Sequence, residues 1–309
     1  TVPGVRTQFS EVQFREIVTK VGCAIVAPTL GIAPADQRLY AVRDVTGTVR
    51  STDLITSSIL AKKLATGLEA LVLDVKTGSG AVMQDRDAAR ALAQALVTTA
   101  NGAGCSTSAI ITDMSQPLLP SIGNALEIAD VMRAFDSGQG PMVEVAIELG
   151  AQLLVQGHVF YTEKGARDGL IKCLSDGTAR NKFGMMVAAQ GGPENFKERW
   201  EDYLNIAPSY EVLAPSDGYV QAMDGTALGR IVVDLGGGRQ REDDQIDHSV
   251  GLSEIVPLGT KLRRGQPIAL VHCHHIKLAE SATLMVQGAI SVGASEPEAK
   301  PLILERIIR

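Results

Sequence analysis

The 309-residue chain has few cysteines, few aromatic residues and no long hydrophobic run. Its four cysteines, Cys23, Cys105, Cys173 and Cys273, are scattered and form no C-x-x-C pair, a distribution typical of reduced thiols. No stretch of about 18 apolar residues is present, which argues against a transmembrane helix. The first residues, TVPGVRTQFS, also lack the apolar core of a signal peptide. We therefore expect a cytoplasmic protein without a membrane span.

Blocks of basic residues are absent as well. The chain has 29 lysines and arginines against 35 acidic residues, a net charge of -6, and no basic cluster with interleaved aromatics. Nucleic acid is therefore not an expected partner. The hydrophobic fraction of 45% and the charged fraction of 21% are ordinary for a globular enzyme, and the length allows two domains of unequal size.

The first two thirds of the chain show the pattern of an α/β domain. An apolar run at 70–75, a helical pattern at about 86–101 and a second apolar run at 108–112 predict a βαβ unit in a largely parallel sheet. Ser10 and Gln13 predict a capping box for a helix that ends at Gly22, followed by a buried strand at 23–27. Further helices are predicted at 124–135, 141–155, 163–174 and 181–190.

From Ala214 onward, short valine-rich runs separated by Gly, Pro and Asp predict a β-rich module. The segments SDGYVQAMDG and PLGTKLRRGQPIALV resemble the two halves of a biotinyl or lipoyl carrier domain, which is barrel-like. The turn between the carrier halves would hold the modified lysine, but it offers only Met223, Asp224 and Gly225. We expect the carrier fold without the carrier chemistry.

Three other segments resemble ligand-binding motifs, but none of them is a specific signal. The cluster His272, Cys273, His274, His275 lacks paired ligand spacing, and neighbours on a strand point to opposite faces, so a metal site is not favoured. Residues 235–243 (LGGGRQRED) lack the GK[ST] ending of a P-loop, which favours a hairpin turn. Residues 76–80 (KTGSG) follow a predicted strand at the edge where parallel sheets bind ligands, although a plain βα loop explains them equally well.

A polar stripe lies on a predicted helix at about 53–64. Ile55, Ser58, Ile59 and Lys62 fall at i, i+3, i+4 and i+7, so they share one face. Burying an unpartnered hydroxyl costs about 1 to 3 kcal/mol, and burying a charge costs more, so the stripe could line a polar cleft. In the alternative, which the pattern alone favours, Lys62 reaches solvent and Ser58 bonds to the backbone. Together with Arg43, the two polar groups would suit a planar imide or carbonyl-rich ring.

Four segments carry a family resemblance: LYAVRDVTGTV, LITSSILAKKLATGLEALVLDVKTGSGA, TDMSQPL and GNALE. They resemble motifs of the thymidine and pyrimidine nucleoside phosphorylases, and the likeness runs from Val2 to near the C-terminus. The resemblance implies reversible phosphorolysis of pyrimidine deoxynucleosides, in which thymidine and phosphate give thymine and 2-deoxyribose 1-phosphate. It implies inorganic phosphate as co-substrate and no organic cofactor. Arg43, Ser58 and Lys62 would hold the carbonyl oxygens and N3 of the base.

The same resemblance assigns two further groups of residues. Val49, Ile55 and Val82 match positions that pack on the base, and some relatives carry Phe where this chain has Val82. A bound monovalent cation would be held by backbone carbonyls of Leu118 and Ser121 and by the carboxylate of Asp130, where a relative has Glu.

The resemblance also sets the expected domains. These are an α/β domain at 1–32 and 68–207, part of a small α-helical domain at 33–67, and the C-terminal module at 208–309. The resemblance implies an N-terminal KxSxGG phosphate-binding segment, and this motif is not found among the 309 residues. We expect a homodimer, or a separate chain that supplies this segment. The alternative is a non-catalytic binding or structural protein, but the retention of three polar groups in one cleft favours the enzyme.

Overall fold

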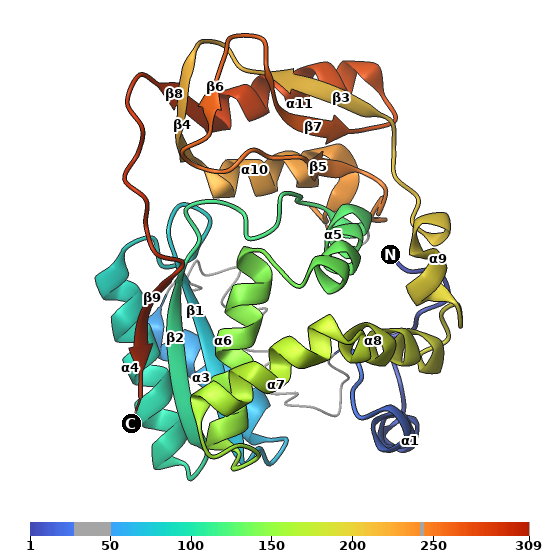
Figure 1. The fold of residues 1–309 in the computed structure, drawn as a ribbon, viewed down its shortest axis with the longest axis vertical. Coiled ribbons are helices and arrows are strands. Elements are labelled where there is room, and N and C mark those ends of the chain that lie inside the picture. The colour runs from blue at the N-terminus through green and yellow to red at the C-terminus, as the bar shows by residue number, and fades with distance from the viewer. Residues whose placement is uncertain (28–50, 242–243, 309) are drawn as a thin grey trace.

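The computed structural model describes residues 1–27, 51–241 and 244–308 (Figure 1). Its first sheet has the order β1-β2-β9. Strand β1 (Ala70–Thr77) pairs in parallel with β2 (Ser106–Asp113), and β9 (Ile303–Ile307) pairs antiparallel with β2. The chain therefore has the expected mixed α/β fold.

Helices cover this sheet and extend to one side of it (Figure 1). Helix α4 (Arg86–Gly102) begins after Asp85, whose side chain accepts a hydrogen bond from Ala88 N, and it buries its apolar face on β1 and β2. Helix α3 (Thr52–Leu64) packs on α4. The remaining helices of this part are α1 (Glu11–Val21), α5 (Asn124–Ser137), α6 (Pro141–Gln156), α7 (Glu163–Ser175), α8 (Thr178–Ala189) and α9 (Phe196–Tyr203).

The side chain of Gln190, at the end of α8, makes several of the hydrogen bonds that attach the N-terminal segment. The predicted capping box of Ser10 and Gln13 is confirmed, but the predicted strand at 23–27 is wrong, because these residues form no strand ladder. Instead, the buried amide of Gln190 accepts from Ile25 N at 2.8 Å and donates to Ile25 O at 2.7 Å and Arg6 O at 2.8 Å. Three backbone groups are thereby satisfied without a neighbouring strand.

The C-terminal module contains two three-stranded sheets with the orders β3-β7-β5 and β6-β4-β8. These sheets are not joined by strand pairing among the described residues, so the expected barrel is not confirmed. The strands are β3 (Ser209–Leu213), β4 (Gly218–Met223), β5 (Gly251–Ser253), β6 (Lys261–Leu262), β7 (Pro267–His272) and β8 (Ile290–Gly293). Helix α11 (Ile276–Ala289) packs on β3, β7 and β8.

The run at 231–233 is one of the valine-rich runs that predict a β-rich module, but it is helical. Helix α10 (Gly225–Val232) begins after Asp224, whose side chain accepts from Ala227 N at 2.9 Å. It continues as a π-helical turn (Val233–Gly237) in place of the hairpin expected at 235–243. Leu228, Ile231, Val232 and Leu235 are buried at helical spacing, and burial of this one apolar face explains the helix.

The last strand, β9, falls inside the range 208–309 but belongs to the first sheet, and charged residues hold it there (Figure 1). Glu305 accepts hydrogen bonds from Arg90, which hold the pKa of that carboxyl below its usual range. Its neighbour Arg306 donates to Glu148 of α6 and, at 3.0 Å, to Glu163 of α7. Successive side chains point to opposite faces of a strand, so β9 is fixed from both sides.

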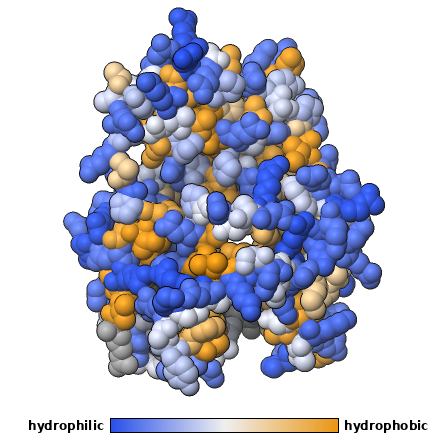
Figure 2. Space-filling model, viewed as in Figure 1, coloured by the Kyte–Doolittle hydropathy of each residue, from blue (hydrophilic) through white to orange (hydrophobic). Residues whose placement is uncertain are grey.

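No helix in the described part of the chain is long and apolar enough to cross a membrane. The face shown in Figure 2 is largely hydrophilic, with apolar side chains gathered toward its middle.

The buried carboxylate of Glu148 yields a prediction about stability. Arg167 and Arg306 both donate to it, and its side chain is 6% exposed. We expect Glu148→Gln to lower the free energy of unfolding by about 2 to 4 kcal/mol, because it removes a buried negative charge that Arg167 and Arg306 share and leaves Arg306 with Glu163 alone. Urea denaturation measures this change.

The matched control is Glu11→Gln. Glu11 pairs with Arg15 at 2.8 Å, but its side chain is 76% exposed, so we expect no measurable change. Equal effects of the two substitutions would contradict the assignment of β9 docking to Glu148.

Candidate active site

Helix α3 places Ser58 and Lys62 side by side. The helix buries Thr56, Ser58 and Leu60, and its other residues remain partly or fully exposed. The ammonium of Lys62 donates to Ser58 Oγ at 3.3 Å. The hydroxyl therefore has a charged side-chain partner, in contrast to the alternative that pairs it with the backbone.

The stripe lines a cavity of about 400 Å³. Ile55, Ser58, Ile59 and Lys62 form one wall. The others come from β1, from the segment that follows it and from α4, through Leu73, Asp74, Val75, Lys76, Val82, Met83, Leu92 and Leu96. The structure thus brings together four of the predicted site residues, Ile55, Ser58, Lys62 and Val82. Two more, Arg43 and Val49, lie outside the described residues.

The cavity pairs a polar edge with apolar walls. Ser58 is buried and Lys62 is partly buried, while isoleucine, leucine and valine side chains supply most of the remaining surface. A hydroxyl can donate or accept, and an ammonium donates only. Such a site can hold a flat, mostly apolar ring by carbonyl groups along one edge.

Polar side chains join the two parallel strands near their carboxyl ends. Asp74 accepts from Thr112 Oγ1 at 2.6 Å and from Lys76 Nζ at 2.5 Å. Lys76 also donates to Thr112 Oγ1 at 3.0 Å. Sequence reasoning placed Lys76 at a ligand-binding edge and missed Asp74 and Thr112. The strand register could have identified Thr112, because it places Thr112 opposite Lys76. That register can be used only once β1 and β2 are known to pair.

The segment after β1 makes a tight turn, residues 78–81, which we call the GSG turn. Gly78 has a φ of 123°, a conformation that favours glycine, and a Cβ there would lie 2.6 Å from Ser115 N. Met83 then pairs with Thr77 in a parallel bridge. The turn therefore fixes where Val82 enters the cavity.

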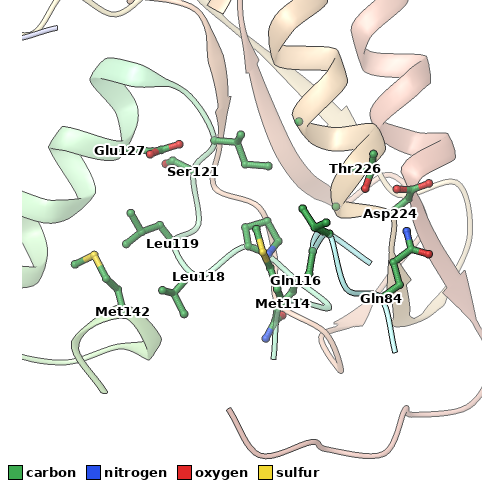
Figure 3. A pocket seen from close by; sticks show the side chains of 17 residues that line it. Gln84, Met114, Gln116, Leu118, Leu119, Ser121, Glu127, Met142, Asp224 and Thr226 are labelled. Atoms are coloured by element: carbon green, nitrogen blue, oxygen red, sulfur yellow. The ribbon is translucent and has the colours of Figure 1, made fainter. Parts of the chain in front are cut away.

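A second cavity, of about 920 Å³, lies between the GSG turn, the segment after β2 and the start of α10 (Figure 3). Leu118 and Ser121, two of the predicted cation ligands, are among its lining residues. The third, Asp130, is buried on α5 and outside this lining. One oxygen of Asp130 accepts from Arg133 at 2.8 Å, and the other, Oδ2, is buried without a hydrogen-bond partner.

Two histidines of the cluster at 272–275 make side-chain hydrogen bonds within the protein. His272 lies between Ala207 O and Ser253 Oγ, at 3.0 and 2.7 Å from its two ring nitrogens, and His274 contacts Ser249 Oγ at 2.9 Å. Within the described ranges, no three His, Cys, Asp or Glu residues are grouped as metal ligands would be.

Comparison with known proteins finds a matching family for both the α/β part and the C-terminal module of the chain. Residues 1–180 match the family described as "Glycosyl transferase family, a/b domain", and residues 219–293 match "Pyrimidine nucleoside phosphorylase C-terminal domain". The thymidine phosphorylase of Sinorhizobium fredii (strain NBRC 101917 / NGR234) is 45% identical over 311 residues, covering 99% of this chain and 71% of the relative. That of Sinorhizobium medicae (strain WSM419) is 45% identical over 316 residues, covering 100% of this chain and 71% of the relative. The chain therefore belongs to the family of thymidine and pyrimidine nucleoside phosphorylases.

Proposed function

We propose that this protein catalyses the phosphorolysis of pyrimidine deoxynucleosides, converting thymidine and phosphate to thymine and 2-deoxyribose 1-phosphate. The observation that carries the proposal is the Ser58–Lys62 pair at the edge of a cavity lined mainly by apolar residues, in a chain 45% identical to thymidine phosphorylases. The enzyme would be a pentosyltransferase that uses inorganic phosphate and no organic cofactor.

The polar edge would act on the departing base. When the bond between C1' of the sugar and N1 of the base breaks, the electron pair goes to the base, and negative charge spreads to its carbonyl oxygens. Ser58 and Lys62, joined by Arg43, would donate hydrogen bonds to these oxygens and to N3. Donors that are positioned before the charge develops stabilise it without reorganisation. A phosphate oxygen would then form the new bond to C1' as the sugar passes through an oxocarbenium-like state.

The apolar walls would orient the ring. Ile55 and Val82, together with Val49, would pack on the faces and methyl edge of thymine, and Met83 is another apolar lining residue of the cavity. An apolar surrounding also strengthens the hydrogen bonds of the polar edge, because water is kept from competing for the donors.

We also propose that a monovalent cation binds at Asp130. Oδ2 is a buried carboxylate oxygen without a partner, and no described residue donates a backbone hydrogen bond to the carbonyl of Leu118 or Ser121. Carboxylate and carbonyl oxygens are hard ligands suited to such a cation. Bound there, it would offset the charge of Asp130 and fix the segment before α5.

The alternative is a binding or structural protein without catalysis. Such a protein would bind the base in the cavity without cleaving the nucleoside. One measurement therefore distinguishes the two functions. Phosphate-dependent release of thymine from thymidine by the full protein supports the enzyme. Binding of thymine without any such release would establish the alternative.

Lys62 provides a direct test of the polar edge. We expect Lys62→Ala to lower kcat/KM for thymidine roughly hundredfold to thousandfold, because a donor to the developing charge is lost. Lys63→Ala is the control: Lys63 is adjacent, carries the same charge and is exposed, so its removal should leave kcat/KM nearly unchanged. A Lys62 variant with wild-type kcat/KM would refute the role of Lys62.

Asp130 provides a test of the cation. We expect potassium chloride to raise Tm relative to choline chloride at equal ionic strength, and Asp130→Asn to abolish that difference, because ligand binding stabilises the folded state. Scanning calorimetry measures both. A potassium effect that persists in the variant would place the cation elsewhere.

A further inference from the structure

The GSG turn is held on its inner side by the segment after β2. Gly80 N donates to Met114 O at 3.1 Å, and Met114 N donates to Thr77 O at 2.6 Å. Ser79 Oγ approaches Ser115 O at 3.4 Å. This side of the turn therefore belongs to the first sheet and its loops.

The outer side of the turn is held by the C-terminal module. Gly225 N, at the start of α10, donates to Ser79 Oγ at 3.3 Å, and Thr226 Oγ1 donates to Ser79 O at 2.9 Å. The two backbones are in close contact, because a Cβ on Gly225 would lie 2.7 Å from Gly80 Cα and 2.9 Å from Gly80 N. Figure 3 shows Thr226 and Asp224 at this end of the helix, beside the larger cavity.

The same turn determines the position of Val82. Ala81 N donates to Gly78 O at 3.0 Å, and the bridge between Met83 and Thr77 closes the segment into a short loop. Val82 is 62% exposed, so packing of its own side chain does little to hold it. Its place in the wall of the smaller cavity is set by the backbone of the turn.

We propose that Gly225 and Thr226 are positioning residues for the pyrimidine site: the start of α10 presses the GSG turn inward and so sets how far Val82 enters the base cavity. This inference rests on the proposed function, because it identifies the ligand of that cavity as a pyrimidine base. The C-terminal module thereby influences the width of a cavity that none of its own residues line.

A pair of glycine substitutions on one helix tests the contact. In Gly225→Ala the added methyl meets Gly80, whereas in Gly229→Ala, four residues further along α10, a Cβ meets nothing within 4 Å. Calorimetric titration of the full chain with thymine gives Kd, and hydrogen exchange of residues 77–83 reports on the turn. We expect Gly225→Ala to raise Kd at least about threefold and to speed exchange, and Gly229→Ala to do neither.

A second pair of substitutions tests the hydroxyl group of Thr226, with little change in side-chain volume. Thr226→Val removes the donor to Ser79 O and keeps the shape, and Thr226→Ser keeps the donor. We expect Thr226→Val to raise Kd for thymine about threefold to tenfold, and Thr226→Ser to restore wild-type affinity. Unfolding midpoints of all four variants show that each remains folded.

The outcomes separate this inference from the proposed function. If the unmodified chain binds no thymine, the proposed function fails at that step. If it binds thymine, and Gly225→Ala and Thr226→Val leave both Kd and exchange unchanged, the positioning role is wrong. Faster exchange with unchanged Kd also overturns it, because the turn would then move without consequence for the base.

Discussion

The structure depends on the return of the chain to its first sheet. After β1 and β2 are formed, the chain leaves to build the C-terminal module and comes back as β9, which pairs with β2. Both ends of the module are thereby attached to the first part of the molecule, one through α9 and the other through β9 (Figure 1). Anchoring at two points restricts the module far more than a single linker would, because the ends of the intervening chain can no longer move apart. The close contact between α10 and the GSG turn follows from this restriction.

Charge contributes to the return alongside apolar burial. Glu305 faces Arg90 and Arg86, and Arg306 faces Glu148 and Glu163, so adjacent residues of a five-residue strand are paired on opposite faces. A strand this short buries little apolar surface, and its pairing register would be poorly specified by hydrophobicity alone. The alternating charges supply the missing specificity.

Local patterns predicted the local structure well. The capping box of Ser10 and Gln13 and the parallel pair β1 and β2 were predicted from residue spacing and are confirmed. The sequence pattern did not predict helix α10, although Leu228, Ile231, Val232 and Leu235 fall at i, i+3, i+4 and i+7, because valines bounded by glycines are also typical of short strands. The docking of β9 could not be predicted, since its ion pairs join residues more than 140 positions apart.

In the candidate site, too, local spacing could be predicted from the sequence, whereas contacts between distant residues could not. The spacing of Ser58 and Lys62 predicted that they share a face, but pattern alone favoured a solvent-directed lysine. The pairing of the two side chains and the cavity beside them became visible only once α3 was packed on α4. The contact of Gly225 and Thr226 with Ser79 has no signal in the sequence, because 146 residues separate Gly225 from Ser79.

The hydrogen bonds of the Gln190 side-chain amide bear on local unfolding of the N-terminal segment. The amide takes the place that a strand would occupy beside residues 6 and 25, so the N-terminal segment is attached by the side chains of Gln190 and Lys182, a few backbone bonds and some apolar packing rather than by a ladder. Attachment of this kind can be lost without disturbing the sheet, which makes the segment a separate unit of local unfolding. Proteolysis under native conditions would then begin there, while β1, β2 and the base cavity remain intact.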